Sequence, residues 1–200
     1  AYICEPEIAL NEPIMKNIPN YFTLLNLVLG CVAIIFILQT GEGLINYNGE
    51  DWKVYLPEPI WWGSVCIGLA AVVDFLDGFV ARLFKATSPL GKQLDSLADV
   101  VSFGVAPGLI LYQLLRISFA YEPDGLDTSM VWLLPALLVP CAAAWRLAVF
   151  NLDESQAYGF KGMPTPATGL LVASLPLILL HDRFGIQGVL LNKWFLYGLI

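Results

Sequence analysis

The most informative part of the sequence for the fold is residues 66–103, which read C-I-G-L-A-A-V-V-D-F-L-D-G-F-V-A-R-L-F-K-A-T-S-P-L-G-K-Q-L-D-S-L-A-D-V-V-S-F. Its apolar residues continue on both sides into runs long enough to cross the roughly 30 Å hydrocarbon core of a bilayer as helices. A short polar connection between these runs contains Ser88 and Pro89, which are typical of a helix N-cap and the first helical position. The stretch therefore predicts two antiparallel membrane helices with four aspartates near their shared end.

The composition of the whole chain also favours a membrane protein. Hydrophobic residues make up 58% of the 200 residues, whereas soluble domains contain roughly 45–50%. The mean hydropathy is +0.69. Because lipid offers no hydrogen-bond partner to the backbone, apolar runs of this length are expected to be helices. The formal net charge of −7 excludes a nucleic-acid partner, since no basic face exists to neutralise phosphates.

We therefore predict an all-α fold, a polytopic membrane helical bundle of about six transmembrane helices. It forms a single domain over residues 1–200. The Ile18-Pro19-Asn20 segment is expected to break the chain just before the first helix. The chain also ends inside an apolar run at Ile200, so we expect the natural protein to continue. The expected helices cover residues 21–39, 60–84, 90–119, 130–150, 165–180 and 189 onward.

Lysine and arginine residues indicate which side of the membrane each loop occupies, because short cytoplasmic loops are enriched in them. One side carries Lys16, the connection at residues 82–92, Arg146 and Lys161. The other side has fewer positive charges among many acidic residues. We therefore predict that the N-terminus and the aspartates face the cytoplasm, in a protein integral to the cell membrane.

The four aspartates are spaced for a common site. Asp74 and Asp77 are three residues apart, and Asp95 and Asp99 are four apart, so each helix presents its carboxylates on one face. Because a short connection makes the two helices antiparallel, all four carboxylates are expected at one membrane depth. An aspartate at the centre of a membrane helix costs about 2.5–3.5 kcal/mol on insertion scales, and neighbouring carboxylates repel one another.

Divalent cations are the expected compensation for this charge, because Arg82 alone cannot neutralise four carboxylates. Oxygen ligands favour Mg²⁺, Mn²⁺ or Ca²⁺ over zinc. We predict Mg²⁺ or Mn²⁺, two ions in all, on Asp74, Asp77, Asp95 and Asp99. Gly78 and Ala81 leave the adjacent backbone bare, so a bulky ligand can approach. An alternative hypothesis is a cation transporter, which would spread its carboxylates across the membrane depth and would not place an arginine among them.

The pattern from Asp74 to Asp99 resembles the signature of the CDP-alcohol phosphatidyltransferases, D-x-x-D-G-x-x-A-R-x8-G-x-x-x-D-x-x-x-D, and matches every fixed position. The resemblance implies a six-helix membrane fold, a CDP-linked lipid donor, divalent cations on the aspartates, and a homodimer. It also implies that Asp99 acts as a base toward the acceptor hydroxyl. Beside cations, Asp99 has the alternative role of orienting the hydroxyl by a hydrogen bond. The expected residues for binding the CDP-lipid are Asn20, Thr23, Asp77, Gly78, Ala81, Arg82 and Ser88.

Three further stretches resemble the bacterial and archaeal phosphatidylserine synthases within that family. They are K-N-I-P-N-Y-F-T-L-L-N-L at 16–27, S-L-A-D-V-V-S-F-G-V-A-P at 96–107 and F-K-G-M-P-T-P-A at 160–167. This resemblance implies CDP-diacylglycerol and L-serine as substrates, with phosphatidylserine and CMP as products. The alternative within the family is an acceptor such as glycerol 3-phosphate or inositol phosphate, which would call for a denser basic pocket.

An amino-acid acceptor requires a positive group for its carboxylate. Arg146 and Lys161 are the available cations on the side predicted to be cytoplasmic, and a guanidinium suits a carboxylate in a two-point contact. We therefore predict Arg146 and Lys161 as acceptor-binding residues.

Overall fold

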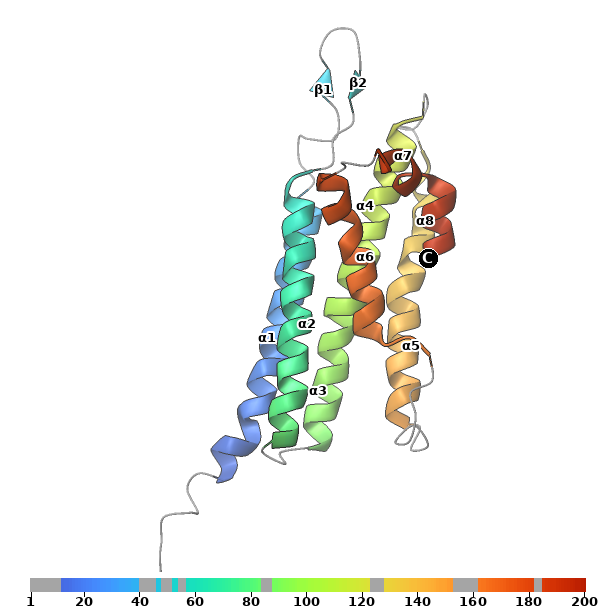
Figure 1. Cartoon of the computed structure of the whole chain (residues 1–200). Coiled ribbons are helices and arrows are strands. Elements are labelled where there is room, and N and C mark those ends of the chain that lie inside the picture. Colours follow the sequence, from blue (N-terminus) through green and yellow to red (C-terminus); the bar gives the residue numbers. More distant parts are fainter. Residues whose placement is uncertain are drawn as a thin grey trace, which may run out of the picture.

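The computed structural model of the chain describes residues 12–39, 46–47, 52–53, 57–83, 88–122, 128–152, 162–181 and 185–200. Long helices lie side by side along most of the molecule, and the predicted all-α membrane bundle is confirmed (Figure 1). The helices are α1 (Glu12–Leu38), α2 (Pro59–Leu83), α3 (Pro89–Asp99), the π-helix η1 (Val100–Val105), α4 (Ala106–Ala120), the 3₁₀ turns η3 (Met130–Trp132) and η4 (Leu134–Leu137), α5 (Leu138–Leu152), α6 (Thr165–Leu180), α7 (Gln187–Leu190) and α8 (Lys193–Leu199).

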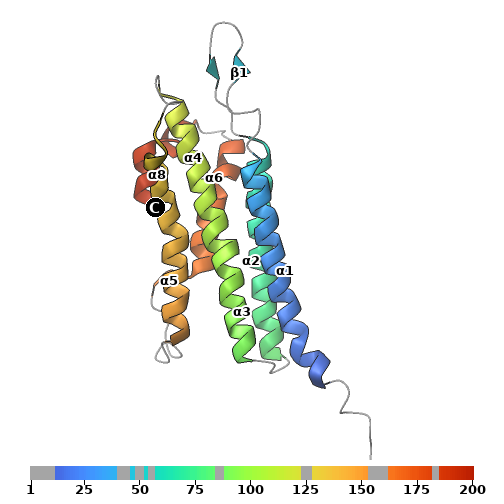
Figure 2. The ribbon, with the colours of Figure 1, turned by 180° about the vertical axis from the view of Figure 1, so that it is seen from behind.

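Four of the described helical segments are long and apolar enough to cross a membrane. They cover Pro19–Leu38, Pro59–Leu83, Pro89–Ala120 and Leu134–Leu152. Helix α6 is apolar but has only 16 residues, and the helix expected from residue 189 is instead the two short helices α7 and α8. The ribbon seen from behind shows α3 and α4 as one continuous column beside α1 (Figure 2).

The start of the first helix differs from the prediction. Helix α1 begins at Glu12 and contains Pro19, so the expected break at Ile18-Pro19-Asn20 is wrong. Membrane helices tolerate an internal proline, and Pro19 lies inside the continuous helix α1. The helix therefore continues through the proline and carries Asn20 and Thr23 on its N-terminal half.

The polar segment between α1 and α2 contains a short hairpin. Strands β1 (Asn46–Tyr47) and β2 (Trp52–Lys53) are antiparallel, with Asn46 opposite Lys53 and Tyr47 opposite Trp52. The hairpin lies at the opposite end of the bundle from the point where α2 ends and α3 begins (Figure 1). The two ends of the molecule are thus built differently, and the aspartates belong to the end without the hairpin.

The start of α3 follows the sequence prediction. Ser88 has an extended backbone conformation and its side-chain oxygen accepts a hydrogen bond from the Gly91 amide, with Pro89 in the first turn. This cap fixes where the helix begins and hence the rotation of its carboxylate face. At its other end, α3 passes directly into the π-helix η1 at Val100, immediately after Asp99.

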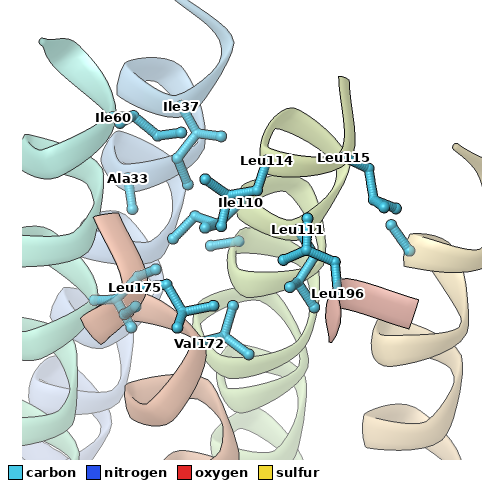
Figure 3. Close-up of a cluster of buried hydrophobic side chains, with 14 of the residues drawn as sticks. Ala33, Ile37, Ile60, Ile110, Leu111, Leu114, Leu115, Val172, Leu175 and Leu196 are labelled. Carbon is cyan, nitrogen blue, oxygen red and sulfur yellow. The ribbon is translucent and has the colours of Figure 1, made fainter. Parts of the chain in front are cut away.

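The apolar core lies in the half of the bundle nearer the hairpin. Side chains from α1, α2, α4, α6 and α8 meet there and are almost fully buried (Figure 3). Labelled members include Ile37, Ile60, Ile110, Leu114 and Leu196, each with no exposed surface. Because the core occupies this half, the polar residues of α1, α2 and α3 are gathered in the other half.

Glycines let the helices approach closely, as is typical of helix packing in membranes. A Cβ atom at Gly63 of α2 would lie 3.1 Å from the Ala33 carbonyl oxygen of α1. A Cβ atom at Gly169 of α6 would lie 3.0 Å from the Phe103 Cα atom of η1. These contacts pack α1 closely against α2 and η1 closely against α6.

Candidate active site

Three of the four predicted carboxylates form a cluster. Asp74 comes from α2, and Asp95 and Asp99 come from successive turns of α3. One carboxylate oxygen from each residue lies within 4.8 Å of the others. The helical spacing and the antiparallel arrangement thus bring carboxylates from two helices to one level.

Asp77 stands beside this cluster rather than within it. Its Oδ2 accepts a hydrogen bond from the Thr23 hydroxyl of α1, and both side chains are buried. The three-residue spacing from Asp74 places Asp77 on the same side of α2, facing α1. The carboxylate of Asp77 therefore joins α1 to α2 at the edge of the acidic cluster.

The chemistry of this cluster fits divalent cations. Its donors are carboxylate oxygens, which Mg²⁺, Mn²⁺ and Ca²⁺ prefer as ligands. Asp99 is only 6% exposed, and no lysine or arginine in the described part of the chain forms an ion pair with the four aspartates. Since closely spaced buried carboxylates repel one another, a bound cation is the group that would stabilise them.

A cleft with a volume of about 910 Å³ opens over the aspartates. Helices α1, α2 and α3 supply most of its wall. Helix α6, which begins above the lower ends of α2 and α3 in Figure 1, contributes Pro166 and Leu170. Phe75 of α2 also lines the cleft, and 67% of its surface is exposed. The cleft therefore combines an acidic floor with an apolar wall on the outer surface of the bundle.

The structure places all the predicted donor-binding residues on this cleft. Arg82 donates from Nε to the Gly78 carbonyl oxygen at 2.9 Å, one turn back on α2. A Cβ atom at Gly78 would meet only Nη2 of Arg82, at 3.6 Å, so the backbone there is open to a ligand. The predicted residues that line the cleft are Asn20, Thr23, Asp77, Gly78, Ala81, Arg82 and Ser88.

Of the two predicted acceptor residues, Arg146 lies among the described residues but is not part of the cleft wall. Arg146 of α5 does not line the cleft, and its Nη1 donates to the Thr165 hydroxyl at 2.6 Å. Thr165 precedes Pro166, which does line the cleft, so Arg146 lies one residue behind the wall. Lys161 lies outside the described residues.

Lys92 is a cleft residue that the sequence analysis did not assign to the site. It lines the cleft from α3. Its Nζ lies 3.4 Å from the Asn151 carbonyl oxygen and 5.8 Å from the centre of the Phe150 ring, both near the end of α5. The signal was present, because Lys92 is three residues before Asp95 and a helix places such residues on one face.

Asn26 is a second residue that was missed. It lies in α1 with no exposed surface, and its Nδ2 donates to Oδ1 of Asp99 at 3.2 Å. An asparagine inside an apolar membrane run is costly and marks a polar contact. Because Asn26 lies 73 residues before Asp99, the sequence alone did not indicate that Asp99 is its partner.

Comparison with known proteins agrees with this geometry. The family model of the CDP-alcohol phosphatidyltransferases matches residues 16–199. A CDP-diacylglycerol–serine O-phosphatidyltransferase of Bacillus subtilis is 28% identical over 184 residues, which cover 90% of this chain and 89% of that protein. One from Helicobacter pylori is 40% identical over 168 residues, covering 83% of this chain and 59% of the relative.

A third relative of the same name, from Mycobacterium leprae, is 34% identical over 189 residues. That match covers 91% of this chain and 53% of the relative, so the chain spans about half the length of the longer protein. The family match runs through every helix that contributes to the cleft. The chain belongs to the CDP-alcohol phosphatidyltransferase family.

Proposed function

We propose that this chain transfers the phosphatidyl group of CDP-diacylglycerol to the hydroxyl group of L-serine, giving phosphatidylserine and CMP. The observation that carries the proposal is the cleft itself, which gathers the four aspartates and six further residues predicted to bind the donor. The names of the relatives from three bacteria support serine as the acceptor. Residues 1–200 would act as one domain, in keeping with the single core cluster that joins five helices.

Within this proposal, Asp74, Asp77, Asp95 and Asp99 hold two divalent ions, Mg²⁺ or Mn²⁺. When bound, such ions neutralise the diphosphate and stabilise the departing CMP. The all-oxygen donor set and the burial of Asp77 and Asp99 support this assignment. The hydrogen bond from Thr23 holds Asp77 at the side of the cleft that faces α1.

The donor would lie along α1 and α2. Arg82 keeps its Nε on the Gly78 carbonyl oxygen, so the remaining guanidinium nitrogens can reach a phosphate oxygen. The open backbone at Gly78 and Ala81 leaves space for the nucleotide, and Asn20 and Ser88 close that side of the cleft. The apolar side chain of Phe75 faces the lipid part of the donor.

The transfer itself is one displacement at phosphorus. The serine oxygen forms a bond to the phosphorus that carries diacylglycerol, and the bond from that phosphorus to the bridging oxygen breaks, so its electron pair leaves with CMP. The hydroxyl proton passes toward the Asp99 carboxylate, which accepts it or orients the hydroxyl by a hydrogen bond. Holding both substrates in one cleft lowers the barrier by alignment.

The acceptor would lie on the opposite side of the aspartates, toward α5 and α6. Arg146 and Lys161 remain our proposed partners for the serine carboxylate, and the cleft adds Lys92. Lys92 supports this placement because it lines the cleft on the side where α3 meets the end of α5. Among the described residues Lys92 donates a hydrogen bond to one carbonyl oxygen, which leaves further donors of the ammonium group for an anionic group.

We also propose that the aspartate end of the bundle faces the cytoplasm and that the protein is a homodimer in the cell membrane. The end of α2, the start of α3 and the end of α5 lie at one end of the molecule (Figure 1). That end carries Arg82 and Lys92, as the distribution of positive charge in membrane proteins favours. Chemical cross-linking in native membranes tests the dimer, and a single band at the monomer mass would contradict it.

The proposed function is tested by an acceptor scan. The purified protein is supplied with CDP-diacylglycerol and Mn²⁺ or Mg²⁺, and CMP release is measured with L-serine, glycerol 3-phosphate and inositol phosphate in turn. We expect release with serine and formation of phosphatidylserine in equal amount. Release with glycerol 3-phosphate or inositol phosphate but not with serine would refute the serine assignment and leave the family chemistry standing.

A further inference from the structure

Asn26 is a polar residue in the middle of an apolar helix, and its only side-chain hydrogen bond among the described residues is with Asp99. The side chain has no exposed surface, and Nδ2 lies 3.2 Å from Oδ1 of Asp99. An ionised carboxylate can only accept hydrogen bonds, so the amide nitrogen must face Asp99. The contact therefore fixes the orientation of both groups.

The other atom of the amide indicates that this contact is not simply a way of packing α1. Oδ1 of Asn26 is buried and has no hydrogen-bond partner among the described residues. A buried polar atom without a partner destabilises the fold, whereas an apolar residue of the same size would avoid that cost. A purely structural role does not explain an amide here, but a role toward Asp99 does.

The backbone around Asn26 is fixed by a separate contact. Ser102 of η1 donates from its hydroxyl to the Asn26 carbonyl oxygen at 3.1 Å. Gly30 makes room for this serine, because a Cβ atom at that position would lie 2.4 Å from the Ser102 Oγ. Close packing at Gly30 and this hydrogen bond together anchor helix α1 against the turn that follows Asp99.

The π-helix places this anchor next to the carboxylate. Asp99 is the last residue of α3, and η1 starts at Val100. A π turn contains more residues than an α turn, so it changes the direction of the side chains that follow, and such turns occur often at functional sites. Here the change directs Ser102 to α1 while Asp95 and Asp99 keep their α-helical spacing over the cleft.

We propose that Asn26 is a positioning residue for Asp99. It holds one carboxylate oxygen from behind, so that the other oxygen is directed to the acceptor hydroxyl or to a cation in the cleft. This inference rests on the proposed function in one respect, since it takes Asp99 to act on the acceptor. It does not depend on which acceptor is used.

The test compares Asn26→Leu and Asn26→Ser with Ser102→Ala. The control removes a neighbouring buried hydrogen bond to the same residue without touching Asp99. Each protein is purified in detergent, and its melting temperature, kcat, and KM for CDP-diacylglycerol are measured with the acceptor that gives the fastest CMP release in the wild type. Loss of a hydrogen-bond partner of a metal-site ligand typically lowers activity about 10–100-fold.

We expect both Asn26 variants to lose kcat about 10–100-fold while the KM for CDP-diacylglycerol stays within about twofold. Ser102→Ala should keep its kcat within about threefold even if its melting temperature falls. The proposal is overturned if the Asn26 variants keep kcat, or if their loss of kcat follows melting temperature as in Ser102→Ala. It is also overturned if neither Asn26 variant folds while Ser102→Ala does, since the residue would then be structural.

The two proposals fail separately. A wild-type protein that releases CMP with another acceptor but not with serine refutes the serine assignment, and the Asn26 comparison proceeds with that other acceptor. A wild-type serine transferase whose Asn26 variants retain full kcat refutes only the positioning role.

Discussion

The hydroxyl group of Thr23 on α1 donates a hydrogen bond to Oδ2 of Asp77 on α2. Both side chains are almost fully buried, and both line the cleft. Because Asp77 is held by α1, whereas Asp74 lies with Asp95 and Asp99, the four aspartates are divided between two neighbouring positions. Under our proposal of two cations, Asp77 could supply a ligand apart from the cluster of the other three.

Replacement of Thr23 should therefore impair the use of the donor. Thr23→Val keeps the shape of the side chain but leaves Asp77 without its hydrogen-bond donor, which costs about 1–3 kcal/mol for a buried group. We expect kcat/KM for CDP-diacylglycerol to fall by about tenfold or more. The matched control is Thr168→Val on α6, whose side-chain hydrogen bond within the described part of the chain is to the Pro164 carbonyl oxygen. Equal kinetics for the two variants would contradict the role of Asp77 in the site.

Removal of metal should abolish CMP release, and added Mn²⁺ or Mg²⁺ should restore it. The chelator is expected to act on the cluster of Asp74, Asp95 and Asp99. Binding of Mn²⁺ is measured directly by electron paramagnetic resonance, without substrate. Asp95→Asn should lose most of this binding, whereas Glu122→Gln, at the opposite end of the bundle and paired with Lys193, should bind as the wild type does.

The same Asp95→Asn variant should be more stable than the wild type when metal is absent. Its carboxylate lies within 4.8 Å of those of Asp74 and Asp99, and like charges at this distance destabilise the fold. Replacing a functional charge commonly raises stability while it removes activity. Thermal unfolding in the presence of a chelator measures the difference, and a lower melting temperature for Asp95→Asn would argue against repulsion in the cluster.

Lys92 provides a test of the acceptor side. Lys92→Met removes the charge and retains most of the apolar stem, so we expect a KM for serine raised about tenfold, in line with loss of one hydrogen bond to a charged group. The KM for CDP-diacylglycerol should change little. Lys193→Met is the control, because Lys193 pairs with Glu122 at 2.5 Å and does not line the cleft. A rise confined to the KM of the donor would instead place Lys92 on the diphosphate.

Close packing at Gly30 yields a prediction about stability. Gly30→Ala forces a Cβ atom to within 2.4 Å of the Ser102 Oγ, and overpacking of this kind typically costs about 1–3 kcal/mol. Gly198→Ala on α8 is the control, since nothing lies within 4 Å of its added Cβ atom. Thermal unfolding of both variants checks the expectation. Combining Gly30→Ala with Ser102→Gly should restore part of the lost stability.

The aspartate cluster could be predicted from sequence because the relevant information is local. Spacings of three and four residues place Asp74, Asp77, Asp95 and Asp99 on helix faces, and the Ser88 cap with Pro89 forces a tight reversal between the two helices. Helix geometry then places the carboxylates of the two helices close to one another. The separate pairing of Asp77 with Thr23 was not foreseen, since it depends on how α1 packs against α2.

Other features depend on contacts between segments far apart in the chain. Pro19 was expected to break the chain just before the first helix, whereas in the structure α1 continues through it. The contacts of Asn26 with Asp99 and with Ser102 of the π turn join residues more than 70 positions apart. Side-chain spacing along one helix carries no information on such contacts, so Asn26 was overlooked.

The exposed ring of Phe75 on the cleft wall bears on how a lipid reaches the site. Moving a phospholipid out of the bilayer costs about 0.8 kcal/mol of free energy for every methylene exposed to water. For two acyl chains this cost is a prohibitive barrier. With Phe75 and Leu170 on the wall and more than half of the Phe75 surface exposed, the donor can diffuse in sideways from its own leaflet. Its chains then stay in hydrocarbon while only the headgroup enters the protein, and the product can leave by the same lateral route.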